Sequence, residues 1–436
     1  MSMKITRLLA LVLILLSGGI SVLWSISIER ASPLGMVDFK AVYYGSRCLI
    51  QHSDPYNQDE FVRIFQAEGG KFPSEPVRSH FFRRAVTVCI NLPTCLFLIA
   101  PLAMLAWGQA QFLWMFFTSV SLIVAAYLMW DIGADYAPVI SVGLICFFLA
   151  DNESLLAFGN AAGIAVALCV VAVWCFLKDR YVPAGILCLA ISLAMKPHNT
   201  GLVWLFFLLS GGVYRKRALQ SFAVTLLLAI PAMIWVSRVA PHWLPELHSN
   251  FIATSARGDV NDPGPASING TTVIDLQAVV SVFRDNPRFY NLVSYIVCCP
   301  LLLLWAVRAH RTQFSLENAW FALAAVVPLT MLVTYHRPCD VRLLLLTLPA
   351  CTILWAEGYA IRWIALLMNI AGFVSAGDIP LTVYAILTRN YHENIATIRG
   401  QFMAAVVLRP ISLIMLAMGI FYLWIYVRRD PQRGLP

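Results

Sequence analysis

The chain has 436 residues, of which 60% are hydrophobic and only 12% are charged. Soluble globular domains carry about 25% charged residues, so this composition excludes a cytosolic enzyme. Thirty-one Lys and Arg against 23 Asp and Glu give a net charge of +8. In so apolar a chain we expect the basic excess to set membrane orientation, not to bind nucleic acid.

Apolar runs of about 17 to 25 residues recur from Leu8 to Tyr426, each long enough to cross the hydrocarbon core as a helix. The sequence therefore predicts an all-α, polytopic integral membrane protein. The eleven cysteines lie mostly inside these runs, so no disulfide or zinc framework is predicted.

The first run, Leu8 to Ile28, follows Lys4 and Arg7, which places the N-terminus in the cytoplasm and Glu29 outside. A cleaved signal peptide is the alternative. The run is longer than the usual apolar core of such a peptide, about 7 to 15 residues, and no typical cleavage site follows it.

The first outer loop, residues 29–85, is predicted to be helical and to lie in the membrane interface. Its stretch from Asp38 to Ile50 has apolar and aromatic residues at helical spacing. A turn follows, and Asn57 with Glu60 forms a capping pair for a second helix through Gln66. Asp38 lies just outside the first span, where it suits a general base for an acceptor hydroxyl; the alternative is an N-cap.

The number of spans follows from charge alternation. Residues 86–150 contain three apolar stretches between two outer ends, so one stretch must fail to span. Pro138–Ala150 is the shortest, and excluding it leaves about 12 spans with both termini inside. The whole chain, 1–436, is predicted to be a single domain with a second long outer loop at 238–288.

Cations gather at two outer helix boundaries. Lys196 and His198 lie at one, and His336, Arg337 and Arg342 at the other. Cations there suit the phosphate of a lipid-borne donor. The alternatives are a snorkelling lysine and a solvated loop.

Acidic residues give a weaker signal. Asp340 fits a role in positioning an acceptor hydroxyl, orienting an arginine or helping to bind a divalent cation, although a plain salt bridge is the commoner use. Asp151 and Glu153 have an acidic spacing that some metal sites use, but two acids are a weak metal signal. We expect no obligatory metal and no other cofactor.

Several short motifs resemble glycosyltransferase family 87, whose members are GT-C-type membrane enzymes. The stretch MVDFKAVYYGSRCLIQHSDPY resembles the family's signature after the first span. Asn91-Leu92-Pro93 with Ala100-Pro101-Leu102, then Gly159-Asn160, then Met195-Lys196-Pro197-His198 are similar to later family elements, in the same order.

This resemblance implies a mannosyltransferase-like enzyme of the plasma (inner) membrane, with its active site on the non-cytoplasmic face. It would move a hexose from a polyprenyl-phosphate donor to a lipid-linked or envelope glycan acceptor, with inversion. Asp38 would be the catalytic base. Tyr43, Tyr56, Asn160 and Asp340 would bind substrate.

A transporter or flippase for a polar lipid or sugar is the alternative function. Such a protein is expected to place charges or broken helices near the middle of its spans, often in two related halves. Here the spans are nearly free of charge, no repeat is visible, and the polar groups collect at outer ends. That distribution favours chemistry at the membrane surface.

Overall fold

The computed structural model describes residues 3–32, 34–151, 153–267, 272–377, 398–403, 405–406 and 409–429. Within these ranges the chain consists of helices and connecting segments, without a β-strand. The first half forms α1 (Met3–Ala31), α2 (Val37–Ile50), α3 (Gln58–Ala67), α4 (Pro76–Phe82), the π-helical turn η1 (Arg83–Thr87), α5 (Pro93–Ala103), α6 (Trp107–Gly133), α7 (Pro138–Ala150), α8 (Glu153–Phe158), α9 (Ala162–Leu177), α10 (Val182–Met195) and α11 (Pro197–Leu209). The second half forms α12 (Gly212–Val239), α13 (Trp243–Thr254), α14 (Leu276–Phe283), α15 (Pro287–Arg311), α16 (Leu316–Val333), the 3₁₀ helix η3 (Pro338–Thr347), α17 (Leu348–Glu357), α18 (Ile361–Ala376), α20 (Ile398–Met403) and α21 (Pro410–Arg428).

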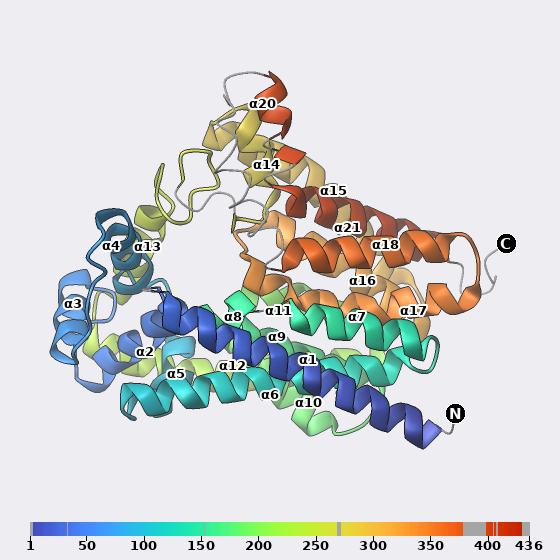
Figure 1. Ribbon diagram of the computed structural model, residues 1–436, viewed down its shortest axis with the longest axis horizontal. Coiled ribbons are helices and arrows are strands. Elements are labelled where there is room, and N and C mark those ends of the chain that lie inside the picture. The colour runs from blue at the N-terminus through green and yellow to red at the C-terminus, as the bar shows by residue number, and fades with distance from the viewer. Residues whose placement is uncertain are drawn as a thin grey trace.

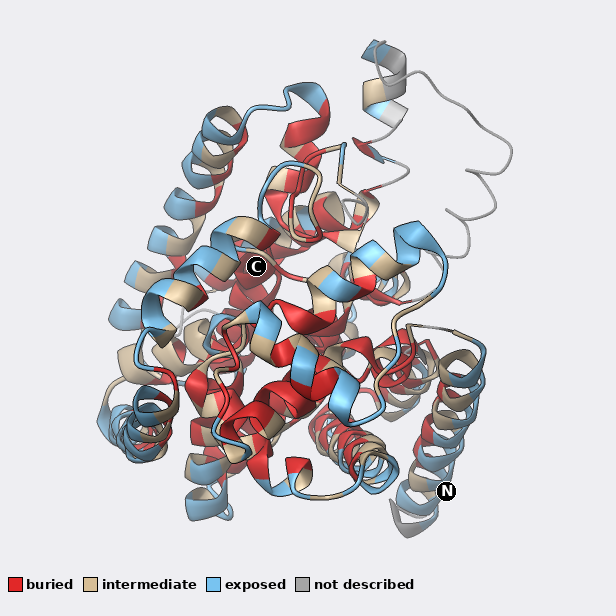
Figure 2. Cartoon of the chain, turned by 90° about the vertical axis from the view of Figure 1, so that its left-hand side faces the viewer, coloured by how far each residue is buried: buried red, intermediate tan, exposed pale blue. Residues whose placement is uncertain are grey.

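The long helices form a bundle with a smaller helical layer at one end. They run side by side across Figure 1, whereas α2, α3, α4 and α13 gather at its left-hand end and α1 begins at the right. Figure 2 looks at that left-hand end and shows buried residues in the middle of the molecule, with exposed faces on the outlying helices. Helix α16 and the segment formed by η3 and α17 are the most buried of the long apolar segments.

The exposed faces of the outlying helices are apolar. Leu16 on α1, Leu227 on α12 and Leu303 on α15 are all exposed. Contiguous apolar surface of this kind is rare on soluble monomers, and it suits contact with lipid tails. Together with eight described helices that are long and apolar enough to cross a membrane, these faces identify an integral membrane protein.

The count of about 12 spans stays a prediction, because the candidate spans are known for the described residues alone. Besides the eight candidate spans, four apolar helices of the described chain are shorter: Pro93–Ala103, Ala162–Leu177, Val182–Met195 and Ile361–Ala376. The stretch Pro138–Ala150, which the charge alternation excluded, belongs to the candidate span Pro138–Phe158 because α8 extends it. Hydropathy counts apolar residues but does not locate helix ends, so the predicted runs and the observed helices differ in length.

The segment predicted to be the first outer loop is helical, as expected. Helix α2 contains the whole stretch from Asp38 to Ile50 that was predicted to be helical. Asn57 caps α3, because its side chain accepts hydrogen bonds from the backbone N–H groups of Asp59 (3.0 Å) and Glu60 (3.3 Å). The carboxylate of Glu60 does not return to Asn57; it accepts from the backbone N–H of Asp54 at 2.7 Å. Glu60, in the first turn of α3, therefore holds the turn that precedes this helix.

Close packing of α16 against α21 gives a stability prediction. A Cβ at Gly419 would lie 2.7 Å from Cδ2 and 2.8 Å from Cγ of Leu329, which is fully buried. Gly419→Ala should therefore destabilise the protein by about 1–3 kcal/mol, the usual cost of overpacking. The measurement is thermal unfolding in detergent. Gly143→Ala is the control, because nothing lies within 4 Å of a Cβ there; an equal loss of stability in both variants would contradict the prediction.

Candidate active site

Four segments that are distant in sequence meet around Asp38. Asp38 lies in the first turn of α2, and Asn160 lies between α8 and α9. Lys196 separates α10 from α11, while Arg337 and Asp340 lie at the start of η3. Helix ends, not helix centres, therefore supply these side chains.

The central feature is a chain of hydrogen bonds from Asp38 to Asp340. The amide Nδ2 of Asn160 donates to Oδ2 of Asp38 at 2.7 Å. Lys196 Nζ donates to Oδ1 of Asn160 at 3.1 Å and to Oδ1 of Asp340 at 2.8 Å. Two carboxylates are thus linked through one amide and one ammonium group.

Asp38 is not the N-cap of α2. Met36 holds that position, in a left-handed conformation, and no side chain caps the helix. The carboxylate of Asp38 instead turns to Asn160, and only its Oδ2 has a hydrogen-bond partner in the described part of the chain. The geometry therefore removes the capping role that the sequence had left open.

Asp340 is the fixed centre of the opposite side. Its side chain is 1% exposed, and it accepts from Lys196, from Nδ2 of Asn199 (2.8 Å) and from the backbone N–H of Arg337 (2.7 Å). A buried carboxylate is stable only with such partners. Asp340 therefore orders both the lysine and the start of η3.

Arg337 carries a positive charge that no acid neutralises directly. Its guanidinium donates to the Val260 carbonyl (2.6 Å) and to the hydroxyls of Tyr335 and Thr272, all neutral groups. Among the described residues its guanidinium forms no salt bridge; its two hydrogen bonds with Asp340 both use the Arg337 backbone. These acceptors hold the cation in place without cancelling its charge.

Two histidines lie next to each other, and one of them, His336, directly precedes Arg337 in the chain. His336 is fully buried, and its Nδ1 lies 2.8 Å from the Thr334 carbonyl, so Nδ1 carries the proton. Burial lowers the pKa of His336, although Asp340 opposes this, and the ring is therefore neutral at pH 7. The ring of His198, which is exposed, lies 5.2 Å from it between centroids.

Burial is the largest influence on the Asp38 carboxyl and raises its pKa above the ordinary value of 3.8. The hydrogen bond from Asn160 and the charges of Lys196 and Arg337 act in the opposite direction. An acid in this environment can be ionised at neutral pH and still be basic enough to accept a proton.

A comparison with known protein families identifies the chain. The model of glycosyltransferase family 87 matches residues 90–335, which is more than half of the sequence. The chain belongs to glycosyltransferase family 87. No curated protein and no solved structure shows significant similarity to it.

Membership of family 87 makes the protein a membrane glycosyltransferase and decides against the transporter that the sequence left open. The matched range contains Asn160, Lys196 and His198 and ends immediately before His336. Asp38 lies outside this range, so its role depends on the geometry above.

Three further residues predicted for the site donate hydrogen bonds to backbone carbonyl groups. The hydroxyl of Tyr43 donates to the Leu105 carbonyl at 2.8 Å, and that of Tyr56 donates to the Asn91 carbonyl at 2.9 Å; both side chains are buried. The guanidinium of Arg342 donates to the Asp151 carbonyl at 3.2 Å.

Asn199 also belongs to the site, but it was not identified as a site residue from the sequence. It is fully buried and lies three residues after Lys196, which places both side chains near one end of α11. A polar residue in the first turn of an apolar run was the available signal. Its amide completes the shell around Asp340.

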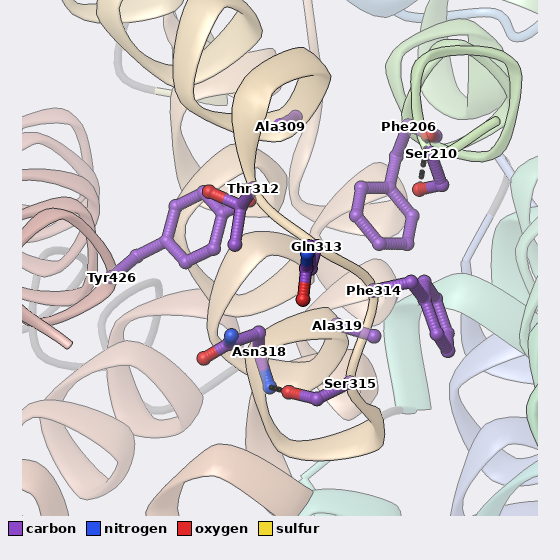
Figure 3. A pocket seen from close by; sticks show the side chains of 10 residues that line it. All are labelled: Phe206, Ser210, Ala309, Thr312, Gln313, Phe314, Ser315, Asn318, Ala319 and Tyr426. Atoms are coloured by element: carbon purple, nitrogen blue, oxygen red, sulfur yellow. Dashed lines mark hydrogen bonds between the residues drawn. The ribbon is translucent and has the colours of Figure 1, made fainter. Parts of the chain in front are cut away.

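No metal cluster is visible in the described part of this glycosyltransferase: nowhere do three or more His, Cys, Asp or Glu side chains gather in a way that could hold an ion. Of the acidic pair Asp151 and Glu153, the Glu153 side chain lies outside the described residues. A small pocket lies elsewhere, where the ends of α11, α15 and α21 meet the start of α16 (Figure 3). None of the residues predicted for the site line it.

Proposed function

We propose that this family 87 glycosyltransferase transfers a hexose, with mannose as the leading candidate, from a polyprenyl-phosphate donor to a lipid-linked or envelope glycan acceptor. The reaction would take place on the non-cytoplasmic face of the plasma membrane and invert the anomeric centre. The observation that carries the proposal is the meeting of one partly accessible carboxylate, Asp38, with the positive charges of Lys196 and Arg337.

One carboxylate suffices for an inverting transfer. Oδ1 of Asp38 takes the proton of the acceptor hydroxyl while that oxygen attacks the anomeric carbon and the bond from this carbon to the phosphate oxygen breaks. The electron pair of the broken bond stays on the departing lipid phosphate. A positive charge held in place before the reaction stabilises it.

Arg337 and Lys196 play different parts in this proposal. Arg337 has no acid on its guanidinium, so its charge is available to the donor phosphate. Lys196 forms a salt bridge with Asp340 and therefore contributes less net charge, but it also donates to Asn160, the residue that contacts the base. The exposed His198 ring lies at the side of this site, next to the neutral His336.

The experiment is sugar transfer by the purified full-length protein in lipid nanodiscs. Radiolabelled polyprenyl-phosphate mannose is the donor, a membrane-lipid extract is the acceptor, and the corresponding glucose and arabinose donors are run in parallel. Labelled glycolipid from mannose, with inverted configuration by NMR, is the expected result. Transfer from a nucleotide-sugar donor alone, or a retained configuration, would overturn the proposal.

The raised pKa of Asp38 predicts the acid side of the pH profile. The base must be ionised to act, so kcat/KM should fall as pH drops through a value above 3.8, the ordinary pKa of Asp. Activity should be constant well above that value, until another group titrates. The measurement is kcat/KM for transfer against pH, with protein integrity checked at each pH. A profile that stays flat down to about pH 4, near the ordinary pKa of Asp, would contradict the assignment.

A further inference from the structure

The side-chain amide of Asn160 has one possible orientation. Its Oδ1 lies 2.9 Å from the backbone N–H of Ala162 and 3.1 Å from Nζ of Lys196, and both of these groups are donors. An amide oxygen, not an amide nitrogen, must therefore occupy that position. Nδ2 is then left to face Asp38, to which it donates at 2.7 Å.

This donor decides which oxygen of Asp38 is open. Nδ2 of Asn160 donates to Oδ2 of Asp38, whereas Oδ1 of Asp38 has no hydrogen-bond partner among the described residues. The hydrogen bond also fixes the plane of the carboxylate. It favours the ionised form, because an amide N–H binds a carboxylate more strongly than a carboxylic acid.

The backbone holds Asn160 in this position. Gly159 has a left-handed φ of +69°, and a Cβ there would lie 2.8 Å from Cβ of Phe39. Trp114 Nε1 donates to the Gly159 carbonyl at 2.9 Å, and the backbone N–H of Met36 donates to the Ala157 carbonyl at 2.7 Å. The turn between α8 and α9 is thus packed directly against the start of α2.

We propose that Asn160 is a positioning residue for the base: it holds the Asp38 carboxylate by Oδ2, leaves Oδ1 open to the acceptor hydroxyl, and links the base to Lys196. The sequence had suggested direct contact of Asn160 with substrate. The inference rests on the proposed function, because it requires Asp38 to act as the base.

The test uses the isosteric variant Asn160→Asp in the transfer assay. The substituted carboxylate keeps an oxygen for the Ala162 N–H and for Lys196, but it replaces the donor to Asp38 by a second acceptor. We expect kcat to fall about 10²-fold, as for a misplaced reacting group, with a smaller change in KM for the donor. The acid limb of the pH profile should move to higher pH, because a neighbouring carboxylate raises the pKa of Asp38.

Two further variants separate positioning from folding. Asn160→Ala should shift the acid limb in the same direction, because Asp38 loses its donor. The exchange Asp38→Asn with Asn160→Asp restores one amide-to-carboxylate hydrogen bond, so its thermal stability should approach that of the wild type while transfer stays absent.

The outcomes are distinguishable. An unchanged pH profile in both single Asn160 variants would overturn the inference and leave Asn160 with only a structural role, as the acceptor for the Ala162 N–H. An active exchange variant would also overturn it, since the carboxylate need not then lie at position 38. An inactive wild type with every donor would remove the proposed function itself, and this inference with it.

Discussion

Replacing Asp38 by Asn is expected to lower kcat by about 10²- to 10⁴-fold, the usual contribution of a general base. Asn has the same size, and its side-chain oxygen can still accept from Nδ2 of Asn160, so the local structure should persist. It cannot take the acceptor proton. Binding of labelled polyprenyl-phosphate mannose should stay close to the wild type, because the proposal assigns the donor phosphate to Arg337 and Lys196 and not to Asp38.

The measurement pairs steady-state transfer with equilibrium donor binding on the same nanodisc preparation. Asp59→Asn is the matched control, because Asp59 is an exposed carboxylate in the first turn of α3, in the same outer loop. Its activity should equal that of the wild type. Full activity of Asp38→Asn would overturn the base assignment, and an equal loss in both variants would show that the substitution disturbs the loop in general.

Local signals in the sequence were sufficient for the first outer loop. Helix periodicity predicts α2, and Asn57 before an acidic first turn predicts the start of α3, because caps act over two or three residues. The ends of the apolar helices could not be predicted in the same way. Helix α5 begins at Pro93 and has only 11 residues, although apolar sequence surrounds it.

The site was predictable only as a set of polar residues near one membrane face. The hydrogen bonds within the site join segments that are far apart in the sequence. Asn160 and Asp38 are 122 positions apart, and Lys196 and Asp340 are 144 positions apart. Arg342 illustrates the limit. Arg337 immediately precedes the 3₁₀ helix η3, and its backbone N–H donates to Oδ2 of Asp340. Arg342 lies within η3, and its guanidinium donates to the Asp151 carbonyl.

The tyrosines show a second limit. A Tyr in an interfacial segment can stack on a sugar or can fill a core, and the sequence pattern is the same in both cases. Here the ring centroids of Tyr43 and Trp107 are 5.1 Å apart, and the Tyr43 hydroxyl donates to a backbone carbonyl. Only the tertiary contact distinguishes the two uses.

Lys196→Met should have two separable effects: it should lower the folding stability, and it should lower the affinity for the donor. Lys196 is the only side chain that forms a salt bridge with Asp340 among the described residues, and Asp340 is buried. Loss of the ammonium leaves that carboxylate without its counter-charge, which should cost about 3–5 kcal/mol of folding stability. The surface variant Lys178→Met is the control, because its partner Asp135 is 60% exposed and such pairs contribute about 0–1 kcal/mol.

The double variant Lys196→Met with Asp340→Asn separates the two effects. It removes both charges together, so stability should return most of the way to the wild type, because no buried charge stays unpaired. Donor affinity should stay low, since one of the two cations next to the phosphate is still missing. The measurements are thermal unfolding and donor binding. Both are made on the wild type, the two Lys variants and the double variant. Recovery of both properties in the double variant would show that Lys196 serves Asp340 alone and that Arg337 binds the phosphate without it.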